Sequence, residues 1–504
     1  MSKKIKRLLI ANRGEIVCRI VATCRALGIE TVTLYAADDA QLPHARIGDR
    51  AVLLEGESLA ETYLSIEKII QAAKDSGADA IHPGYGFLSE NAKFAQAVQK
   101  AGLVFVGPPV QAIKTMGDKA ESRMLCQRIG VPTVPGYDPP PQGFGTASGD
   151  AHYLKAAEKI GYPLLVKAAA GGGGKGMRIV ESKEQLAGAI DSARSEAKNA
   201  FGDDRLLLEK YIVQPHHIEV QVFSDTHGNH VHLFERECSI QRRYQKIVEE
   251  SPSPTISKET RQAITAEAVK ICQHIQYVGA GTVEFIMGAD EKFYFLEMNT
   301  RLQVEHPVTE MVTGFDLVQW QIEVAEGGVL PVKQDEIAQH GHAIEVRLYA
   351  EDAVKDFMPA PGTLQQFSLP HLPRVRCENG YASGNTVSAS YDPMIAKLAA
   401  WGETRAEAIR TLLGALAQTQ IQGVANNRVF LQRVLRHSEF AKGKTATDFI
   451  PRHKQELLEF ERNDDALAAL AAAYMLFTPQ AVATGGEQKA EHSAWTNAKL
   501  KGVA

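Results

Sequence analysis

The stretch from Glu284 to Glu305 carries polar side chains at a spacing that could build a reactive site. Residues 281–306 predict a β-hairpin whose turn lies at 288–292. On the first strand, Val283 and Phe285 share one face and Glu284 lies on the other. On the second strand, polar residues occur at every second position: Glu297, Asn299, Arg301, Gln303 and Glu305. If the chain stays extended, these five side chains project to one side, with neighbours about 6.6 Å apart.

Three of these residues form a candidate cation site. Glu284, Glu297 and Asn299 offer two carboxylates and one amide oxygen. Hard cations such as Mg²⁺ prefer oxygen ligands and often bind together with triphosphate oxygens. The alternative is a solvated strand face without a ligand. Two features favour a site: the sequence Gln-Val-Glu-His-Pro at 303–307 and the mixed pair of Arg301 and Glu305. A solvated strand face seldom shows both.

A run of four glycines at 171–174 predicts an anion-binding loop between two strands. Such a run is costly in entropy inside a regular element, but it lets backbone N–H groups approach an anion closely. Lys175 adds positive charge, and Lys167 and Lys119 follow predicted strands from which they could reach a phosphate. The pattern is neither a P-loop nor a dinucleotide-binding fingerprint. The alternatives are a flexible hairpin tip and ordinary solvated lysines.

A third candidate segment, 235–250, interleaves basic and acidic residues. Its basic residues are Arg236, Arg242, Arg243 and Lys246. In a chain of net negative charge, this mixture suits an anion pocket that holds its own counter-charges. An ordinary surface segment with ion pairs is an equally good interpretation of the same residues.

The elements that would position these residues follow the pattern of an α/β protein. Short apolar strands are predicted at 7–11, 31–36, 78–84 and 103–107, and amphipathic helices at 15–28 and 62–77. This alternation predicts a doubly wound parallel sheet. A loop rich in Pro, Gly and Ser at 137–149 precedes a helix at 151–160 and a mixed α+β region to about 330. A third region opens at 341–352, and a tail begins at about 451, with an apolar helix at 466–477 and a disordered end.

Composition limits the classes of function. The 504 residues suggest three or four domains, and 44% hydrophobic residues are typical of a globular protein. A net charge of −5 gives no reason to expect nucleic acid or an anionic membrane as a partner. The six cysteines lack the spacing of a metal site, so free thiols in a reducing compartment are expected. Because neither a signal peptide nor an apolar run of about 18 residues occurs, we expect a cytoplasmic location without a membrane-spanning helix.

Taken together, the motifs resemble the biotin carboxylase component of biotin-dependent carboxylases over about residues 5–450. The segments that carry the resemblance, in matching order and spacing, are ANRGEI (11–16), HPGYGFLSEN (82–91), MGDK (116–119), GGGGKGM (171–177), ECSIQRRYQK (237–246), EMNTRLQVEHPVTE (297–310), GHAIEVR (341–347) and YDPMIAKL (391–398). The glycine loop alone would fit any ATP-grasp ligase, whereas the combination is specific.

The resemblance implies a fold of α/β and α+β type in three domains. A doubly wound preATP-grasp domain would span 1–118, and an ATP-grasp domain with a mobile lid at about 137–210 would span 119–335. A C-terminal biotin carboxylase domain would span 336–450. Residues 451–504 lie beyond the resemblance, and their own sequence predicts a helical tail or linker whose end is disordered.

The resemblance also implies the reaction. ATP and bicarbonate would form carboxyphosphate, and the CO₂ released from it would carboxylate N1 of biotin on a carrier protein or domain. This is the first half-reaction of an acyl-CoA carboxylase, with two Mg²⁺ or Mn²⁺ ions as cofactors. The implied partners are the biotin carrier, a carboxyltransferase subunit and a second copy of the chain in a homodimer. No Met-Lys-Met biotinylation motif occurs, so biotin is expected on a separate carrier.

Site residues carry over position by position. The ATP-binding residues implied are Lys119, Lys167, Gly172, Gly173, Gly174, Met177, Glu209, Lys210, His217, Gln241 and Tyr244. Glu284, Glu297 and Asn299 would hold the metal ions. Bicarbonate would bind to Lys246, Arg301, Gln303 and the backbone of Val304. Glu305 would deprotonate bicarbonate as the general base, and Arg347 would hold the phosphate and stabilise the biotin enolate.

The sequence departs from the family pattern at one of these positions, and two other functions stay open. Tyr244 stands where many members have histidine, which puts the details of nucleotide contact in question. One alternative is another ATP-grasp ligase that forms an acyl-phosphate, such as a carbamoyl-phosphate-type enzyme. The other is a nucleotide-binding regulatory subunit without catalysis. The C-terminal region resembles that of acyl-CoA carboxylases that act on 3-methylcrotonyl-, geranyl- or propionyl-CoA. The sequence does not determine which acyl-CoA is carboxylated.

Overall fold

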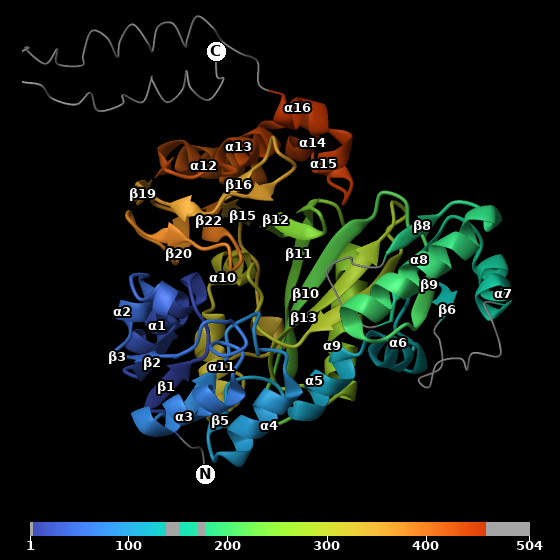
Figure 1. Cartoon of the computed structure of the whole chain (residues 1–504). Coiled ribbons are helices and arrows are strands. Elements are labelled where there is room, and N and C mark those ends of the chain that lie inside the picture. The colour runs from blue at the N-terminus through green and yellow to red at the C-terminus, as the bar shows by residue number, and fades with distance from the viewer. Residues whose placement is uncertain (1–3, 138–150, 170–176, 460–504) are drawn as a thin grey trace, which may run out of the picture. The chain divides into compact units, whose positions relative to one another are not determined.

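The computed structural model describes residues 4–137, 151–169 and 177–459 (Figure 1). The described residues up to Leu458 form one unit. Gly172, Gly173 and Gly174, most of the predicted loop at 137–149 and nearly all of the predicted tail lie outside the described residues. Within the described part, no helix is long and apolar enough to cross a membrane.

The N-terminal region is built on a five-stranded parallel sheet with the order β3-β2-β1-β4-β5. Its strands are β1 (Arg7–Ile10), β2 (Glu30–Tyr35), β3 (Arg50–Leu53), β4 (Ala80–His82) and β5 (Val104–Phe105). The helices of this region are α1 (Glu15–Ala26), η1 (Ala37–Asp39), α2 (His44–Ile47), α3 (Ile66–Ser76), α4 (Ala92–Lys100) and α5 (Val110–Gly117). Leu8 and Ile10 pack toward α1, while Leu9 packs toward α3 and α4. The predicted doubly wound sheet is therefore confirmed, because helices cover both faces of β1.

One predicted helix in this region starts later than expected. Helix α3 begins at Ile66, whereas the sequence pattern predicted a start at residue 62. The Ser65 side chain accepts a hydrogen bond from the Lys68 N–H and so caps the helix. The residues before it form turns.

A four-stranded sheet with the order β6-β9-β7-β8 follows in the middle of the chain. Its strands are β6 (Gly136–Tyr137), β7 (Leu164–Ala168), β8 (Arg178–Val180) and β9 (Leu206–Lys210). The helices around it are α6 (Lys119–Arg128), α7 (Ala151–Ile160) and α8 (Lys183–Phe201). Residues of α7 and α8 pack on the sheet in one buried cluster. The predicted helix at 151–160 is confirmed by α7.

An eight-stranded antiparallel sheet joins the second and third predicted regions, with the order β14-β13-β10-β11-β12-β15-β22-β20. Its strands are β10 (His216–Ser224), β11 (His230–Arg242), β12 (Gln245–Ser251), β13 (Gly279–Met287), β14 (Phe293–Asn299), β15 (His342–Tyr349), β20 (Val375–Asn379) and β22 (Met394–Gly402). Because β12 pairs directly with β15, residues on both sides of the predicted boundary near 336 share one continuous sheet.

The remaining elements are short strand pairs and helices. The strand pairs are β16 (Glu351–Asp352) with β17 (Met358–Pro359), β18 (Gly362–Thr363) with β21 (Thr386–Val387), and β19 (Gln366–Ser368) with β23 (Gln420–Gln422). The helices are α9 (Lys258–His274), α10 (His306–Thr313), α11 (Leu317–Ala325), η2 (Gln334–Glu336), α12 (Arg405–Gln418), α13 (Arg428–Arg436), α14 (Ser438–Ala441), α15 (Phe449–Arg452) and α16 (Lys454–Leu458).

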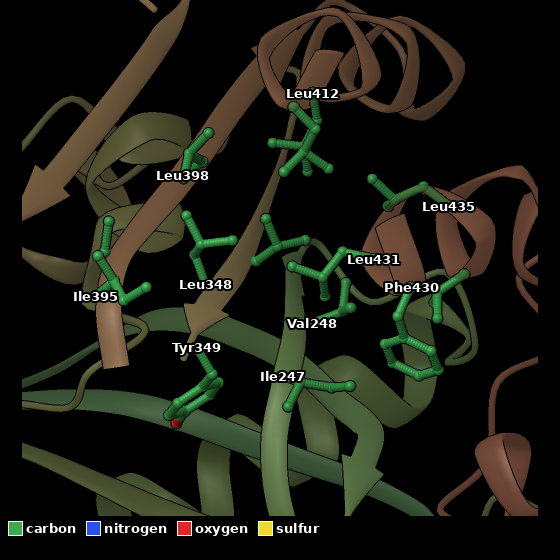
Figure 2. Packing of buried hydrophobic residues seen from close by; sticks show 14 of the residues in the cluster. Ile247, Val248, Leu348, Tyr349, Ile395, Leu398, Leu412, Phe430, Leu431 and Leu435 are labelled. Carbon is green, nitrogen blue, oxygen red and sulfur yellow. The ribbon is translucent and has the colours of Figure 1, made fainter. Parts of the chain in front are cut away.

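The two faces of β12, β15 and β22 differ sharply in polarity. Val248, Leu348 and Leu398 lie in a buried cluster with Leu412 of α12 and Leu431 of α13 (Figure 2). Side chains alternate between the faces of a strand, so the neighbouring residues point to the other side. Those neighbours are Glu249, Glu345, Arg347 and Lys397, and the register pairs Glu249 with Glu345 and Arg347 with Lys397. The apolar face forms the core, and the charged face is left for the site.

Candidate active site

A β-bulge in β14 brings Glu284, Glu297 and Asn299 together. Glu284 pairs with Glu297 across the hairpin, but Phe285 pairs with Phe295, so Leu296 is an extra residue in β14. In a regular strand, Phe295 and Glu297 would share a face. The bulge instead leaves Phe295 in the apolar cluster and turns Glu297 toward Glu284. Asn299 follows on the same face, and its Nδ2 donates to Glu284 Oε1 at 2.9 Å.

The expectation that the chain stays extended to Glu305 is wrong. Strand β14 ends at Asn299, and helix α10 begins at His306 with Glu305 as its N-cap residue. Pro307 favours the helix start at His306, because proline is favoured in the first turn of a helix and cannot donate to a strand ladder. The polar residues of this turn still converge on the strand. Arg301 Nη2 donates to Asn299 Oδ1 at 2.9 Å, and Gln303 Nε2 donates to Glu284 Oε1 at 3.1 Å.

Lys246 of β12 lies at the centre of the site. Its Nζ is 2.7 Å from Glu284 Oε1 and 2.8 Å from Glu305 Oε1, and it also donates to Glu219. Burial by itself would lower the pKa of Lys246, but the three carboxylates outweigh it and raise that pKa well above its ordinary value. The ammonium is therefore charged and holds three carboxylates from separate segments of the chain.

Glu305 is fully buried between two cations. Its Oε1 contacts Lys246, and its Oε2 accepts from Arg347 Nη2 at 2.9 Å. Burial would raise the pKa of Glu305, but Lys246 and Arg347 together hold it well below its ordinary value. Arg347 Nε also donates to Glu249 at 2.6 Å, and burial raises the pKa of Glu249 to about 7. Of the two acids that bond to Arg347, Glu305 thus has the lower pKa.

His217 supports Glu284 from strand β10. Its Nε2 lies 2.7 Å from Glu284 Oε2, and Gln241 Nε2 lies 2.7 Å from its Nδ1. With Gln241 donating to Nδ1, the imidazole carries its proton on Nε2 and donates it to the carboxylate. Burial opposes ionisation of Glu284, but Lys246 and His217 hold the pKa of this carboxyl well below its ordinary value.

Glu219 is a site residue that the sequence interpretation missed. It is fully buried on β10 and pairs with Lys246 and Arg236. The register β10–β13 places it directly opposite Glu284. A glutamate alternating with apolar residues in HHIEVQVF was the available signal. It identifies a buried acid, but only the strand pairing shows which cation the acid meets.

The basic residues of 235–250 do not form one anion pocket. Arg236 is fully buried and donates to Gln221 at 2.7 Å and to Thr309 of α10 at 2.9 Å. Arg242 pairs with Glu351, and Arg243 pairs with Asp356 at the surface. Among these four residues, only Lys246 contacts Glu284 and Glu305. Arg236 shares Glu219 with Lys246, whereas Arg242 of β11 and Arg243 of the following turn pair with acids outside this cluster.

The residues expected around ATP fall into separate groups. Lys167 and Arg123 hold Glu209, and against the effect of burial these cations lower its pKa. Lys119 Nζ lies 3.0 Å from Glu297 Oε2, which links this region to the candidate cation ligands. Lys210 Nζ donates to the Tyr162 carbonyl at 3.0 Å.

Tyr244 and Met177 lie apart from these pairs. Tyr244 occupies the two-residue turn between β11 and β12 with a φ of 64° and an exposed side chain, so the turn rather than the Lys246 cluster determines its position. Met177 directly precedes β8 and is half-buried.

Glu90 joins the N-terminal region to the turn after β14. Its Oε2 accepts from Arg301 Nε at 2.8 Å, and its Oε1 accepts from the Thr300 N–H at 2.9 Å. Arg301 in turn donates to Gln303 at 3.0 Å. Glu90 lies in the segment HPGYGFLSEN, which was noted for its resemblance, but no role was expected for this residue.

Comparison with known proteins places these features in a family. Residues 4–113 match the family described as "Biotin carboxylase, N-terminal domain", and residues 345–452 match "Biotin carboxylase C-terminal domain". Between them, residues 118–333 match "Carbamoyl-phosphate synthase L chain, ATP binding domain". The biotin carboxylase of Campylobacter jejuni, solved as a β-γ-ATP complex, is 43% identical, with a TM-score of 0.85 over 89% of this chain and 99% of that one. This chain belongs to the biotin carboxylase family.

Further biotin carboxylase relatives agree with this assignment. The biotin carboxylase domain of Hydrogenobacter thermophilus 2-oxoglutarate carboxylase, solved as a dimer with MgADP, ADP and bicarbonate, is 42% identical. Its TM-score is 0.86 over 91% of this chain and all of that one. The methylcrotonoyl-CoA carboxylase subunit alpha of Dictyostelium discoideum is 48% identical over 94% of this chain and 67% of its own length. The propionyl-CoA carboxylase alpha chain of Ruegeria pomeroyi is 45% identical over 93% and 71%.

The expectations of family, three-part fold and ATP-dependent ligase activity of the biotin carboxylase type are thereby confirmed. The chain spans about two thirds of the length of the curated relatives, for instance 63% of the rat methylcrotonoyl-CoA carboxylase subunit alpha. The expected cytoplasmic location is not supported by these relatives, because several are named as mitochondrial.

Proposed function

We propose that the Lys246 cluster is where bicarbonate is deprotonated and phosphorylated, as the first step in carboxylating biotin on a separate carrier. The observation that carries this proposal is the ionised, fully buried Glu305 held between Lys246 and Arg347. Bicarbonate is a weak nucleophile, so a carboxylate base between fixed cations suits its activation. The same cations suit an anionic substrate and the anionic carboxyphosphate that follows.

In the proposed reaction, Lys246, Arg301, Gln303 and the Val304 backbone hold bicarbonate. Glu305 takes the proton from its hydroxyl group, and a bicarbonate oxygen attacks the γ-phosphorus of ATP. The bond between that phosphorus and the bridging oxygen of ADP breaks, so ADP leaves and carboxyphosphate forms. Carboxyphosphate then breaks down to CO₂ and phosphate, and this phosphate takes the N1 proton of biotin. Arg347 holds the phosphate and stabilises the resulting biotin enolate, whose N1 attacks CO₂.

The candidate cation ligands fit Mg²⁺ or Mn²⁺. Glu284 lies on β13 opposite Glu297 of β14, and Asn299 lies two residues further along β14. Their carboxylate and amide oxygens are the ligands that a hard cation prefers. We propose that these residues hold two such ions, which would neutralise charge on the triphosphate. The Hydrogenobacter structure, solved with MgADP, supports a magnesium nucleotide as a ligand of this fold.

The nucleotide itself is proposed to contact a wider set of residues. These are Lys119, Lys167, Gly172, Gly173, Gly174, Met177, Glu209, Lys210, His217, Gln241 and Tyr244. Two ion pairs support this, because the pairs of Lys167 with Glu209 and of Lys119 with Glu297 link these lysines to acidic residues of the proposed site.

Partners and domain limits are also proposals. The names of the relatives support a place in an acyl-CoA carboxylase, and the Hydrogenobacter dimer supports a homodimer. A biotin carrier and a carboxyltransferase are the further partners that we propose. We propose domains at 1–118, 119–335 and 336–450, followed by a tail at 451–504. A cytoplasmic location stays a prediction from the sequence.

The proposed function is tested by the dependence of ATP hydrolysis on bicarbonate. We expect hydrolysis that requires bicarbonate and increases when free biotin is added, and carboxybiotin that forms from labelled bicarbonate. A panel of amine acceptors serves as the control and should not support turnover. Rapid ATP hydrolysis without bicarbonate, or turnover that follows an amine instead, would contradict the proposal.

Glu90 is expected to affect bicarbonate more than ATP. In Glu90→Gln, Arg301 loses its carboxylate partner, and the turn that carries Arg301 and Gln303 loses one anchor. Loss of one charged hydrogen bond predicts an increase of about tenfold in the KM for bicarbonate, with the KM for ATP nearly unchanged. Steady-state kinetics with each substrate varied in turn measures both. Equal increases in the two KM values would argue against this role.

A further inference from the structure

Lys397 is a buried lysine on the charged face of β22. The register β15–β22 pairs it with Arg347, so the two side chains lie on the same face of the sheet. Its side chain is fully buried, which is rare for lysine unless the ammonium is paired. The partners of this lysine must therefore compensate for the hydration that its ammonium loses on burial.

The partners of Lys397 include the turn that carries the base. Its Nζ donates to the Val304 carbonyl at 2.6 Å and lies 3.2 Å from Glu15 Oε1. Burial would lower the pKa of Lys397, but Glu15 and Glu345 outweigh it and raise that pKa. The ammonium is charged, so its bond to the carbonyl is of the stronger, charge-assisted kind.

Two acids around Lys397 differ in their contacts. Glu345 is fully buried, and both of its carboxylate oxygens lack a hydrogen-bond partner among the described residues. Burial raises the pKa of Glu345 well above its ordinary value. Glu15 pairs directly with the Lys397 ammonium, and the Val304 carbonyl is the neutral acceptor that this ammonium holds in place.

The bond to Val304 fixes the backbone directly before Glu305. The peptide unit that joins the two residues is planar and trans, so the direction of the Val304 carbonyl also fixes the direction of the Glu305 N–H. Lys246 and Arg347 hold the Glu305 carboxylate at the other end of its side chain. Three cations thus define the position of this residue, two through its carboxylate and one through the main chain.

We propose that Lys397 is a positioning residue for bicarbonate. It acts through the Val304 carbonyl and so fixes the positions of the Val304 backbone and of the base Glu305 relative to Lys246. The proposal rests on the proposed function, because it concerns the same bicarbonate site. Because Lys397 and Arg347 are register partners, the C-terminal strands place both the phosphate-binding arginine and the turn that carries the base.

The test compares substitutions of Lys397 in the full chain. Lys397→Met removes the donor and keeps the length, and it is expected to raise the KM for bicarbonate about tenfold or more with the KM for ATP within about twofold. Lys397→Arg keeps a cationic donor and is expected to restore most of the affinity for bicarbonate. Lys397→Gln is one atom too short to reach the carbonyl at hydrogen-bond distance and gives the same comparison if Lys397→Met does not fold.

Arg405→Met is the matched control. Arg405 forms a part-buried pair with Glu250, at 2.6 Å and 2.9 Å, and touches none of the proposed site residues. Its loss also leaves a buried carboxylate without its cation, so it reproduces a purely structural effect. We expect a lower melting temperature without a selective change in the KM for bicarbonate.

The outcomes distinguish a failure of the proposed role of Lys397 from a failure of the proposed function. An active wild-type chain with an unchanged bicarbonate KM in both Lys397→Met and Lys397→Gln would overturn the role of Lys397 alone. Parallel changes in kcat and in both KM values, matching those of Arg405→Met, would do the same. A wild-type chain whose turnover does not depend on bicarbonate would overturn the proposed function and the role of Lys397 with it.

Discussion

Replacing Glu305 with glutamine is expected to lower biotin carboxylation by about 10²–10⁴-fold, the usual contribution of a general base. Glutamine keeps the size of the side chain but cannot accept a proton from bicarbonate. The wild-type carboxylate is ionised at neutral pH because Lys246 and Arg347 lower its pKa. Carboxybiotin formation and bicarbonate-dependent ATP hydrolysis should fall together, while nucleotide binding measured by calorimetry should change little.

Glu249→Gln is the informative contrast to this substitution. Glu249 also bonds to Arg347, whereas Lys246 pairs with Glu219, Glu284 and Glu305, and burial raises the pKa of Glu249 to about 7. Its replacement should cost less than about tenfold, which corresponds to one hydrogen bond. If Glu249→Gln lost as much activity as Glu305→Gln, the assignment of the base would be wrong.

Replacing Lys246 with methionine is expected to lower both stability and activity. The substitution leaves the buried carboxylates of Glu219, Glu284 and Glu305 without the cation that they share. Breaking a buried ion pair on one side costs about 3–5 kcal/mol. The free energy of unfolding from denaturant titration should fall by that amount, and turnover by about a hundredfold or more, because the cation that faces the anionic substrate is gone.

Two further variants show whether this loss comes from the carboxylate cluster. Lys292→Met removes an exposed lysine whose partner Asp290 is also exposed, so stability should change by less than about 1 kcal/mol. Adding Glu219→Gln to Lys246→Met removes one of the three carboxylates that lose Lys246. It should recover part of the lost stability, although not activity, because Glu219 no longer repels Glu284 and Glu305. A Lys246→Met protein as stable as the wild type would show that the three carboxylates do not depend on this lysine.

The hairpin at 279–299 shows how far the sequence could predict the site. Alternation identified Glu284, Glu297 and Asn299 as neighbours, and the structure brings them together. The reason differs from the one assumed, since the bulge at Leu296 reverses the alternation between Phe295 and Glu297. A bulge depends on the pairing with the neighbouring strand, and a single strand sequence does not reveal that pairing.

Long-range pairing also explains what was missed. Glu219 meets Lys246 only because β10 lies beside β13 and β11, and Lys397 reaches Val304 only because β22 lies beside β15. In the sequence, Lys397 is a single charged residue in an apolar strand, and Glu219 is one of several polar residues in its strand. The fold of the N-terminal region was easier to predict, because strand–helix alternation is local and the doubly wound sheet follows from it. The roles of the site residues came from family resemblance rather than from spacing.

The central claim, that bicarbonate itself attacks ATP in the Lys246 cluster, is tested most directly by oxygen transfer. The chain would be mixed with ATP, Mg²⁺, free biotin and ¹⁸O-labelled bicarbonate, quenched early, and the phosphate analysed by mass spectrometry. Attack by a bicarbonate oxygen on the γ-phosphorus leaves that oxygen in the phosphate when carboxyphosphate breaks down. The account predicts one ¹⁸O atom in each phosphate formed during turnover. Unlabelled phosphate from labelled bicarbonate, with label entering instead from ¹⁸O-water, would contradict it.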